Sequence, residues 1–115
     1  MIKVSETWRL KPEFAQLAIE IMQEMDDLVG PNAHGDPGWS GHAKFLQSAA
    51  DPAKVLVVYR WRSREEHERL AASERPLLAA FQDKYCAAPR EIQYYTEIPV
   101  DADHGRAYPA DEKTR

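Results

Sequence analysis

The chain has 115 residues, of which 43% are hydrophobic and 30% are charged, and its formal net charge is −4. This length suits one domain, and the composition is that of a globular protein. The negative balance gives no general attraction to nucleic acid or to an anionic membrane surface, so neither is expected as a partner. The longest apolar run, Val55–Tyr59, is far too short to cross a bilayer.

Two features of the sequence bear on the cellular compartment. Cys86 is the one cysteine, so no intrachain disulfide can form. The first ten residues, MIKVSETWRL, lack the long apolar segment of a secretory signal. A reducing cytoplasm is therefore the expected location.

The first 41 residues predict a strand, a helix and a loop. Residues 2–9 alternate apolar and polar side chains with period two, which is typical of a strand, although Glu6 occupies an apolar position. A helix is predicted from Pro12, which suits a first turn, to Gly30, which suits a helix end. A loop rich in Gly and Pro is expected over 30–41. The predicted apolar stripe of the helix consists of Phe14, Leu17, Ala18, Ile21, Met25 and Leu28.

The segment HAKFLQSAADPAKVLVVYRW predicts two strands joined by a turn at Asp51 and Pro52. The second of these strands is apolar on both faces, which favours a central position in a sheet. Ser63 followed by Glu66 has the spacing of a capping box, which predicts that a helix begins there.

Pro76 predicts that this second helix is broken into pieces near 64–72 and 76–86. The last strand is expected within REIQYYTEIPV, where Pro99 ends it. The side chains of the second helix that are expected to face the sheet are Leu70, Leu77, Phe81 and Tyr85.

The resulting order is strand, helix, strand, strand, helix, strand, which predicts an α+β, ferredoxin-like βαββαβ fold with a four-stranded antiparallel sheet. One domain is expected over 1–100, followed by a flexible tail over 101–115. Helices can cover one face of such a sheet. The other face carries Leu56, Val58 and Tyr95, so a second copy of the chain is expected to cover it and form a homodimer.

Three sequence features resemble the antibiotic biosynthesis monooxygenase (ABM) domain over roughly residues 1–100. They are the PGW loop before the second strand, the aromatic-rich third strand VLVVYRW, and the helix that carries SERPLL. The resemblance implies a dimeric α+β barrel. The family includes cofactor-independent monooxygenases that oxidise polycyclic phenols to quinones, and also haem-degrading enzymes. The Asn, Trp and His of the haem degraders are missing at the matching positions Trp8, Leu70 and Ala80, so haem degradation is not expected.

The resemblance implies a monooxygenase that acts on an aromatic or polyketide-like intermediate of secondary metabolism, with dioxygen as co-substrate and no metal or other cofactor. Such chemistry needs an apolar pocket and a group that takes a proton from the substrate. The histidines show no metal-ligand spacing and there is no second cysteine, so no metal site is expected. The predicted pocket residues are Trp8, Tyr59, Trp61, Phe81 and Tyr94, with Trp39 as a lid, and the candidate bases are Glu6, His67 and His42.

Each candidate also has a structural interpretation. Tyr59 and Trp61 suit core packing as well as a pocket wall. Glu6 is either at the surface, or buried with a raised pKa, or paired with a nearby arginine such as Arg9, Arg60 or Arg62.

Each of the remaining candidate residues also has two possible interpretations. His67, near a helix N-terminus where protonation is disfavoured, is either a neutral base or simply exposed. His42 suits an exposed strand edge or the pocket mouth, and Trp39 suits a core plug or a lid. The function also has alternatives: a non-oxidative cyclase or isomerase, or a non-catalytic small-molecule-binding or stress-response protein.

Overall fold

The computed structural model describes residues 1–102, so residues 103–115 of the predicted tail lie outside the described residues. In chain order the described elements are β1 (Ile2–Arg9), the 3-10 helix η1 (Pro12–Leu17), α1 (Ala18–His34), β2 (Lys44–Gln47), β3 (Lys54–Trp61), α2 (Arg64–Tyr85) and β4 (Glu91–Tyr95). This order confirms the predicted ferredoxin-like α+β fold.

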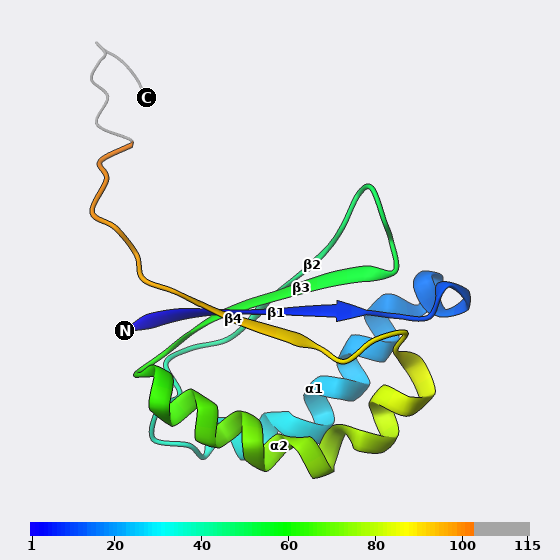
Figure 1. Ribbon diagram of the computed structural model, residues 1–115, viewed down its shortest axis with the longest axis horizontal. Coiled ribbons are helices and arrows are strands. Elements are labelled where there is room, and N and C mark those ends of the chain that lie inside the picture. The colour runs from blue at the N-terminus through cyan, green and yellow to red at the C-terminus, as the bar shows by residue number, and fades with distance from the viewer. Residues whose placement is uncertain (103–115) are drawn as a thin grey trace.

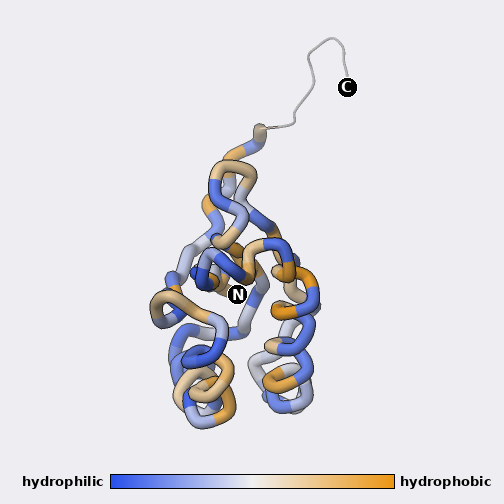
Figure 2. The backbone as a smooth tube through the Cα atoms, turned by 90° about the vertical axis from the view of Figure 1, so that its right-hand side faces the viewer, coloured by the Kyte–Doolittle hydropathy of each residue, from blue (hydrophilic) through white to orange (hydrophobic). Residues whose placement is uncertain are grey.

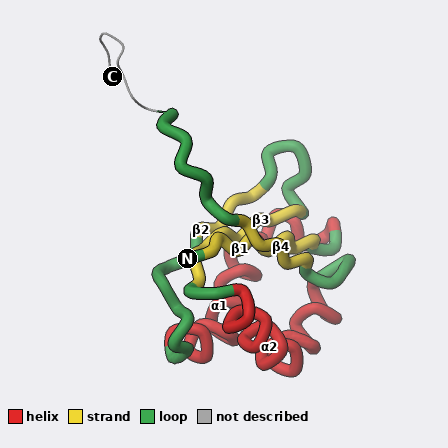
Figure 3. Tube along the Cα trace, turned by 60° about the vertical axis from the view of Figure 1, so that its left-hand side comes forward, coloured by secondary structure: helices red, strands yellow, loops and turns green. Residues whose placement is uncertain are grey.

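The sheet has the strand order β2-β3-β1-β4 with antiparallel pairs throughout, so β1 and β3 are central as predicted. Both helices lie on the same side of the sheet (Figures 1 and 3). In the register, Glu6 faces Val57 on one neighbouring strand and Ile92 on the other. Because directly paired residues point to the same face, Glu6 shares the helix side of the sheet with an apolar set.

The first helix differs from its prediction at the C-terminal end. It continues past Gly30 with Pro31 inside it and ends at His34, so the predicted stop at Gly30 was wrong and the predicted loop over 30–41 begins only at Gly35. Val29 and Gly30 are buried, and the Asn32 side chain donates a hydrogen bond to Ser73 of α2 at 3.1 Å. Burial and this contact between helices offset the one backbone hydrogen bond that Pro31 cannot donate.

The second helix is continuous from Arg64 to Tyr85, so the predicted break at Pro76 was wrong. The proline ring is exposed, and the cost of an interior proline, about 3 kcal/mol, is offset by apolar burial on both sides of it. Continuity also sets the phase of the buried face. Leu78 is 1% exposed whereas the predicted Leu77 is 44% exposed.

The first helix begins as a 3-10 helix, η1, which winds more tightly than the α-helix that follows it. Ala18, Ile21 and Met25 are buried as predicted, whereas Leu17 and Leu28 are exposed and Met22 and Val29 are in the core. The core lies between the sheet and the two helices, which stand side by side below the sheet when the molecule is turned (Figure 2).

The outer face of the sheet carries apolar side chains that the helices do not cover. Leu46 and Tyr95 are each 52% exposed, and Leu56 and Val58 are half-buried. β4 ends at Tyr95, short of the predicted end at Pro99, and the segment 96–102 extends away from the helices (Figure 1). None of the helices within residues 1–102 is long and apolar enough to cross a membrane.

Candidate functional site

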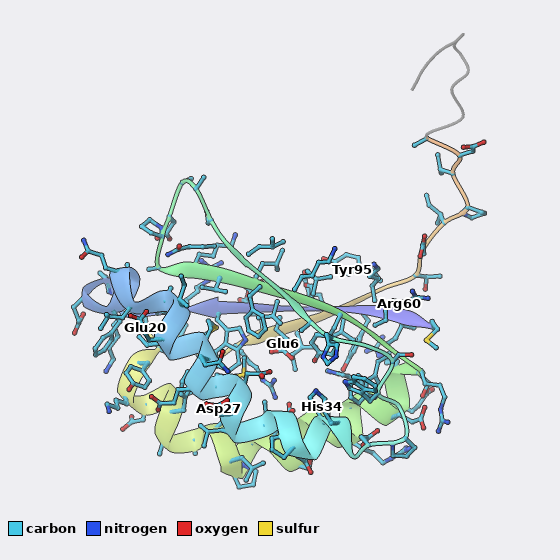
Figure 4. The ribbon with its side chains drawn as sticks, turned by 180° about the vertical axis from the view of Figure 1, so that it is seen from behind. Glu6, Glu20, Asp27, His34, Arg60 and Tyr95 are labelled. Atoms are coloured by element: carbon cyan, nitrogen blue, oxygen red, sulfur yellow. The ribbon has the colours of Figure 1, made fainter. Side chains whose placement is uncertain are left out.

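Ionisable side chains from several elements meet between the sheet and α2. Glu6 of β1 is 4% exposed, Glu74 of α2 is 3% exposed, and His67 of α2 is fully buried. Arg90, which directly precedes β4, reaches the same space with a side chain that is 7% exposed. Glu6 points toward the helices, whereas Tyr95 lies on the opposite side of the sheet (Figure 4).

Both carboxylate oxygens of Glu6 are engaged. The Trp8 indole Nε1 donates a hydrogen bond to Oε1 at 2.9 Å, and the Tyr59 hydroxyl donates to Oε2. Arg90 Nη1 lies 3.3 Å from Oε2 and forms an ion pair with it. Glu6 is thus neither at the surface nor paired with Arg9, Arg60 or Arg62. Its partner is an arginine that the sequence did not single out.

Arg90 also binds a second buried carboxylate. Its Nη2 donates to Glu74 Oε1 at 2.9 Å, so one guanidinium lies between two carboxylates. Burial raises the pKa of Glu74, the charge of Arg90 opposes that rise, and the charge of Glu6 adds to it. Burial alone would lower the pKa of Arg90, but the charges of Glu6 and Glu74 outweigh it and the pKa is raised.

His67 joins this cluster through two tyrosines. Its Nε2 lies 2.5 Å from the Tyr59 hydroxyl and its Nδ1 lies 2.9 Å from the Tyr94 hydroxyl. Burial lowers the pKa of His67 to about 4, so the imidazole is neutral at neutral pH. The structural interpretation of His67 as an exposed residue was wrong, because the helix that Ser63 caps turns this side chain toward the sheet.

The hydrogen bonds of this network run in one direction. A neutral imidazole has one donor and one acceptor nitrogen. Since Tyr59 gives its hydroxyl hydrogen to Glu6, Nε2 of His67 donates to the Tyr59 oxygen and Nδ1 accepts from Tyr94. Burial raises the pKa of both tyrosine hydroxyls, which keeps them protonated as donors. The result is a directed chain from Tyr94 through His67 and Tyr59 to Glu6.

A cavity of about 160 Å³ adjoins this network between the sheet, α1, α2 and the loop before β2. Of the predicted site residues, those that line it are Glu6, Trp39, His42, Tyr59 and Trp61. Glu74 lines it as well. Aromatic and carboxylate side chains therefore share its walls. A second cavity of about 250 Å³ between α1 and β2 has none of the network residues in its lining.

Four predicted site residues are not part of the cavity lining. Trp8 is fully buried and packs edge to face against Phe81, with ring centroids 5.7 Å apart. His67 and Tyr94 lie behind Tyr59, in contact with each other. These residues support the wall from the core side.

Gly38, in the loop before β2, packs against Trp61 in the wall of the cavity. A Cβ atom on Gly38 would lie 2.2 Å from the Trp61 Nε1, so only glycine fits without movement. Arg62 N donates to the Gly38 carbonyl at 3.0 Å, which ties the loop to the end of β3. The Trp61 Nε1 is buried and has no hydrogen-bond partner within residues 1–102.

Trp39 and His42 lie where the cavity meets the surface. Trp39 is 36% exposed, so it is a wall residue at the rim and not a plug of the core. Its ring packs edge to face against His42, with centroids 5.5 Å apart, and His34 packs against both rings. His42 is exposed and lines the cavity, but it lies in the loop before β2 and not at a strand edge. Among the described residues, no group of three or more His, Cys, Asp or Glu could hold a metal ion.

Sequence reasoning missed Glu74 and Arg90. Glu74 follows Leu70 by four residues and precedes Leu78 by four, so it lies on the buried face of a continuous α2. That signal was hidden by the break predicted at Pro76. Arg90 lies in a short connection, and no periodicity marked it as buried.

No protein-family model matches the chain, and no curated protein sequence matches it. Solved structures do match. An antibiotic biosynthesis monooxygenase aligns with a TM-score of 0.63 and 18% identity, covering 86% of this chain and 100% of that one. A monooxygenase of Streptomyces coelicolor in complex with nanaomycin D aligns with a TM-score of 0.67 and 14% identity, covering 87% and 89%.

SnoaB, a cofactor-independent oxygenase of Streptomyces nogalater, aligns with a TM-score of 0.57 and 11% identity, covering 86% of this chain and 94% of that one. Identities this low show the fold alone. The chain has the fold of the ABM proteins, as the resemblance implied.

Proposed function

We propose that this protein, which has the ABM fold, oxidises a small aromatic substrate with dioxygen in the cavity beneath β1 and β3. One observation carries the proposal. The cavity has aromatic walls, from Tyr59, Trp61 and Trp39, and buried carboxylates open onto it. A flat ring packs well against such walls, and a few polar groups among them orient it.

The proposed reaction begins when a protein group takes the proton of the substrate hydroxyl, which leaves an electron-rich phenolate. The phenolate reduces dioxygen and then combines with it at a ring carbon. Loss of water gives the quinone: phenol and O₂ become quinone and H₂O. One oxygen atom enters the ring, the other leaves as water, and the substrate supplies all the electrons. SnoaB is described as cofactor-independent, which supports direct use of dioxygen here.

The candidate bases differ in whether they reach the cavity directly. Glu6 and His42 line the cavity, whereas His67 reaches it through the Tyr59 hydroxyl. In this proposal Trp8, Phe81 and Tyr94 act from behind the wall and Trp39 covers the rim.

The size of the cavity favours a small substrate. Its volume, about 160 Å³, is close to that of an apolar cavity of about 150 Å³ that holds a single benzene. A single-ring phenol therefore fits without rearrangement. A polycyclic or polyketide-like intermediate of secondary metabolism requires the loop that carries Trp39 to move outward.

A non-oxidative isomerase or cyclase is the second candidate, and the directed hydrogen-bond chain from Tyr94 to Glu6 favours it. Such a chain can deliver a proton at one atom while a carboxylate removes one at another. The third alternative, a non-catalytic binding or stress-response protein, uses the same cavity. We further propose that the protein acts in the cytoplasm as a homodimer.

Oxygen uptake separates these functions. With hydroxybenzenes and naphthols, we expect the wild type to consume one O₂ per quinone formed, and to place one ¹⁸O atom in each product molecule under ¹⁸O₂. Glu6→Gln removes the negative charge at the inner end of the network, so kcat should fall by ~10²-fold or more, as for the ~10²–10⁴-fold contribution of acid–base catalysis. Glu13→Gln, an exposed change in η1, should leave kcat unchanged.

Other outcomes decide for the alternatives. Conversion of a substrate to an isomer without oxygen uptake would identify the non-oxidative enzyme. Ligand binding with no turnover across the panel would identify the binding protein. Near-UV circular dichroism of each variant shows whether the aromatic packing is intact.

A further inference from the structure

The two carboxylates that line the cavity differ in how fully they are bound. Glu6 accepts hydrogen bonds from Trp8 and Tyr59 and pairs with Arg90, so both of its oxygens are used. The hydrogen-bond partner of Glu74 within residues 1–102 is Arg90, at Oε1. Glu74 therefore keeps acceptor capacity for a ligand in the cavity, and Glu6 keeps little.

The charges around the cavity also favour Glu74 as an acceptor. Two buried carboxylates share one guanidinium, so the cluster has a surplus negative charge when both are ionised. Burial raises the pKa of Glu74, so this carboxylate accepts a proton more readily than an ordinary glutamate does. A ligand that donates a hydrogen bond satisfies the free acceptor capacity of this carboxylate, whereas an anionic ligand is repelled by the surplus negative charge.

Other polar groups at the cavity are less suited to this role. His34 and His42 are exposed, and Asp26 of α1 is half-buried, so water competes for all three. Glu74 is 3% exposed and lies on α2, held by a guanidinium that Glu6 fixes in turn. A hydrogen bond at such a buried, preorganised site is worth more than one at the rim.

We propose that Glu74 accepts the hydrogen bond of the substrate hydroxyl and then its proton, while Glu6 is the fixed counter-charge of Arg90. The inference rests on the proposed function and names the form of its substrate: a neutral, hydroxyl-bearing aromatic ring. In the step, the substrate O–H bond breaks, an O–H bond forms on Glu74, and the negative charge passes to the substrate oxygen.

Binding of matched probes tests the acceptor role without turnover. Phenol donates a hydrogen bond, methoxybenzene has the same ring but no donor, and benzoate is an anion. Titrations can be followed by NMR on the indole N–H signals of Trp39 and Trp61, which lie in the cavity wall. We expect wild-type affinity for phenol to exceed that for methoxybenzene about 10- to 100-fold, as for a hydrogen bond to a charged acceptor, and benzoate to bind weakest.

Two substitutions separate the acceptance of a hydrogen bond from the acceptance of a proton. Glu74→Met removes both, so phenol and methoxybenzene should bind equally and benzoate should gain affinity. Glu74→Gln keeps an acceptor oxygen that cannot take a proton, so part of the phenol preference should remain while kcat falls at least tenfold. Glu65→Gln removes an exposed charge from the same helix and should behave as wild type.

The outcomes separate this inference from the function it rests on. Phenol preference retained in Glu74→Met, or no binding of phenol by the wild type, overturns the acceptor role. Oxygen uptake unchanged in Glu74→Gln overturns the proton transfer and leaves the oxygenase standing. A Glu74-dependent phenol preference without oxygen uptake in the wild type supports the acceptor role and overturns the oxygenase.

Discussion

At the residue scale, burial decides the chemical state of the candidate site. In the sequence, His67 suits either an exposed position or a neutral base, and Glu6 suits the surface, a buried position or an ion pair. Both are buried in the fold and are held by hydrogen bonds to tyrosines. Removing such polar groups from water is costly, so each needs its partners in place for the chain to fold.

This burial predicts how stability depends on pH. The pKa of His67 is about 4 in the folded protein against an ordinary 6.5, so the unfolded chain takes up the proton first as the pH falls. The free energy of unfolding should therefore decrease as the pH drops from 6.5 toward 4. At one pKa unit per 1.36 kcal/mol, the decrease amounts to at most about 3 kcal/mol.

Urea unfolding of the wild type and of His67→Gln at pH 7, 5.5 and 4.5 checks this dependence. The difference between the two proteins should shrink steadily toward low pH. The carboxyl of Glu74, whose raised pKa acts in the opposite direction, is present in both proteins and cancels in the comparison. Parallel pH curves for the two proteins would contradict the assignment to His67.

At the element scale, the strands could be predicted well and the helix phases less well. Period-two alternation placed Glu6 and Trp8 on the helix side of the sheet, and the paired register confirms this. The buried faces of the two helices differ from their predictions. A 3-10 helix precedes α1, and α2 continues through Pro76 without a break. Tertiary packing, which local propensity does not contain, decided both.

The loop before β2 supplies a prediction at the same scale. Gly38→Ala would place a methyl group 2.2 Å from the Trp61 Nε1, so the loop or the indole must move. We expect a loss of about 1–3 kcal/mol in the free energy of unfolding, as for overpacking of a core. Gly35→Ala is the matched control, because its Cβ would meet Pro31 O at an ordinary 3.5 Å.

Thermal unfolding measures the loss, and the indole N–H signal of Trp61 reports whether the ring has shifted. A Gly38→Ala protein as stable as Gly35→Ala, with an unmoved Trp61 signal, would show that the loop does not pack against the cavity wall in solution.

At the scale of the whole molecule, the outer face of the sheet exposes apolar side chains to solvent. Leu46 and Tyr95 are half exposed there beside Leu56 and Val58, and both helices lie on the other side. We expect a homodimer in which a second copy covers this face. Leu56→Lys should convert it to a monomer at micromolar concentration, because a buried, unpaired ammonium is costly at an interface.

Sedimentation velocity of the wild type and two variants checks the dimer. Ile19→Lys introduces the same charge at an 82% exposed position of α1, away from the outer face, and should remain a dimer. A stable wild-type monomer at micromolar concentration, or a dimer that survives Leu56→Lys, would contradict the proposed covering of this face.

By itself, the sequence determined the order of elements, the central place of β1 and β3, and the aromatic character of the space beneath them. Local periodicity carries this information, because it records which side of each element avoids water. Only the tertiary structure decided that Arg90 lies between Glu6 and Glu74. These three residues are distant along the chain, and Glu74 and Arg90 became candidates only when the fold buried their charges beside Glu6.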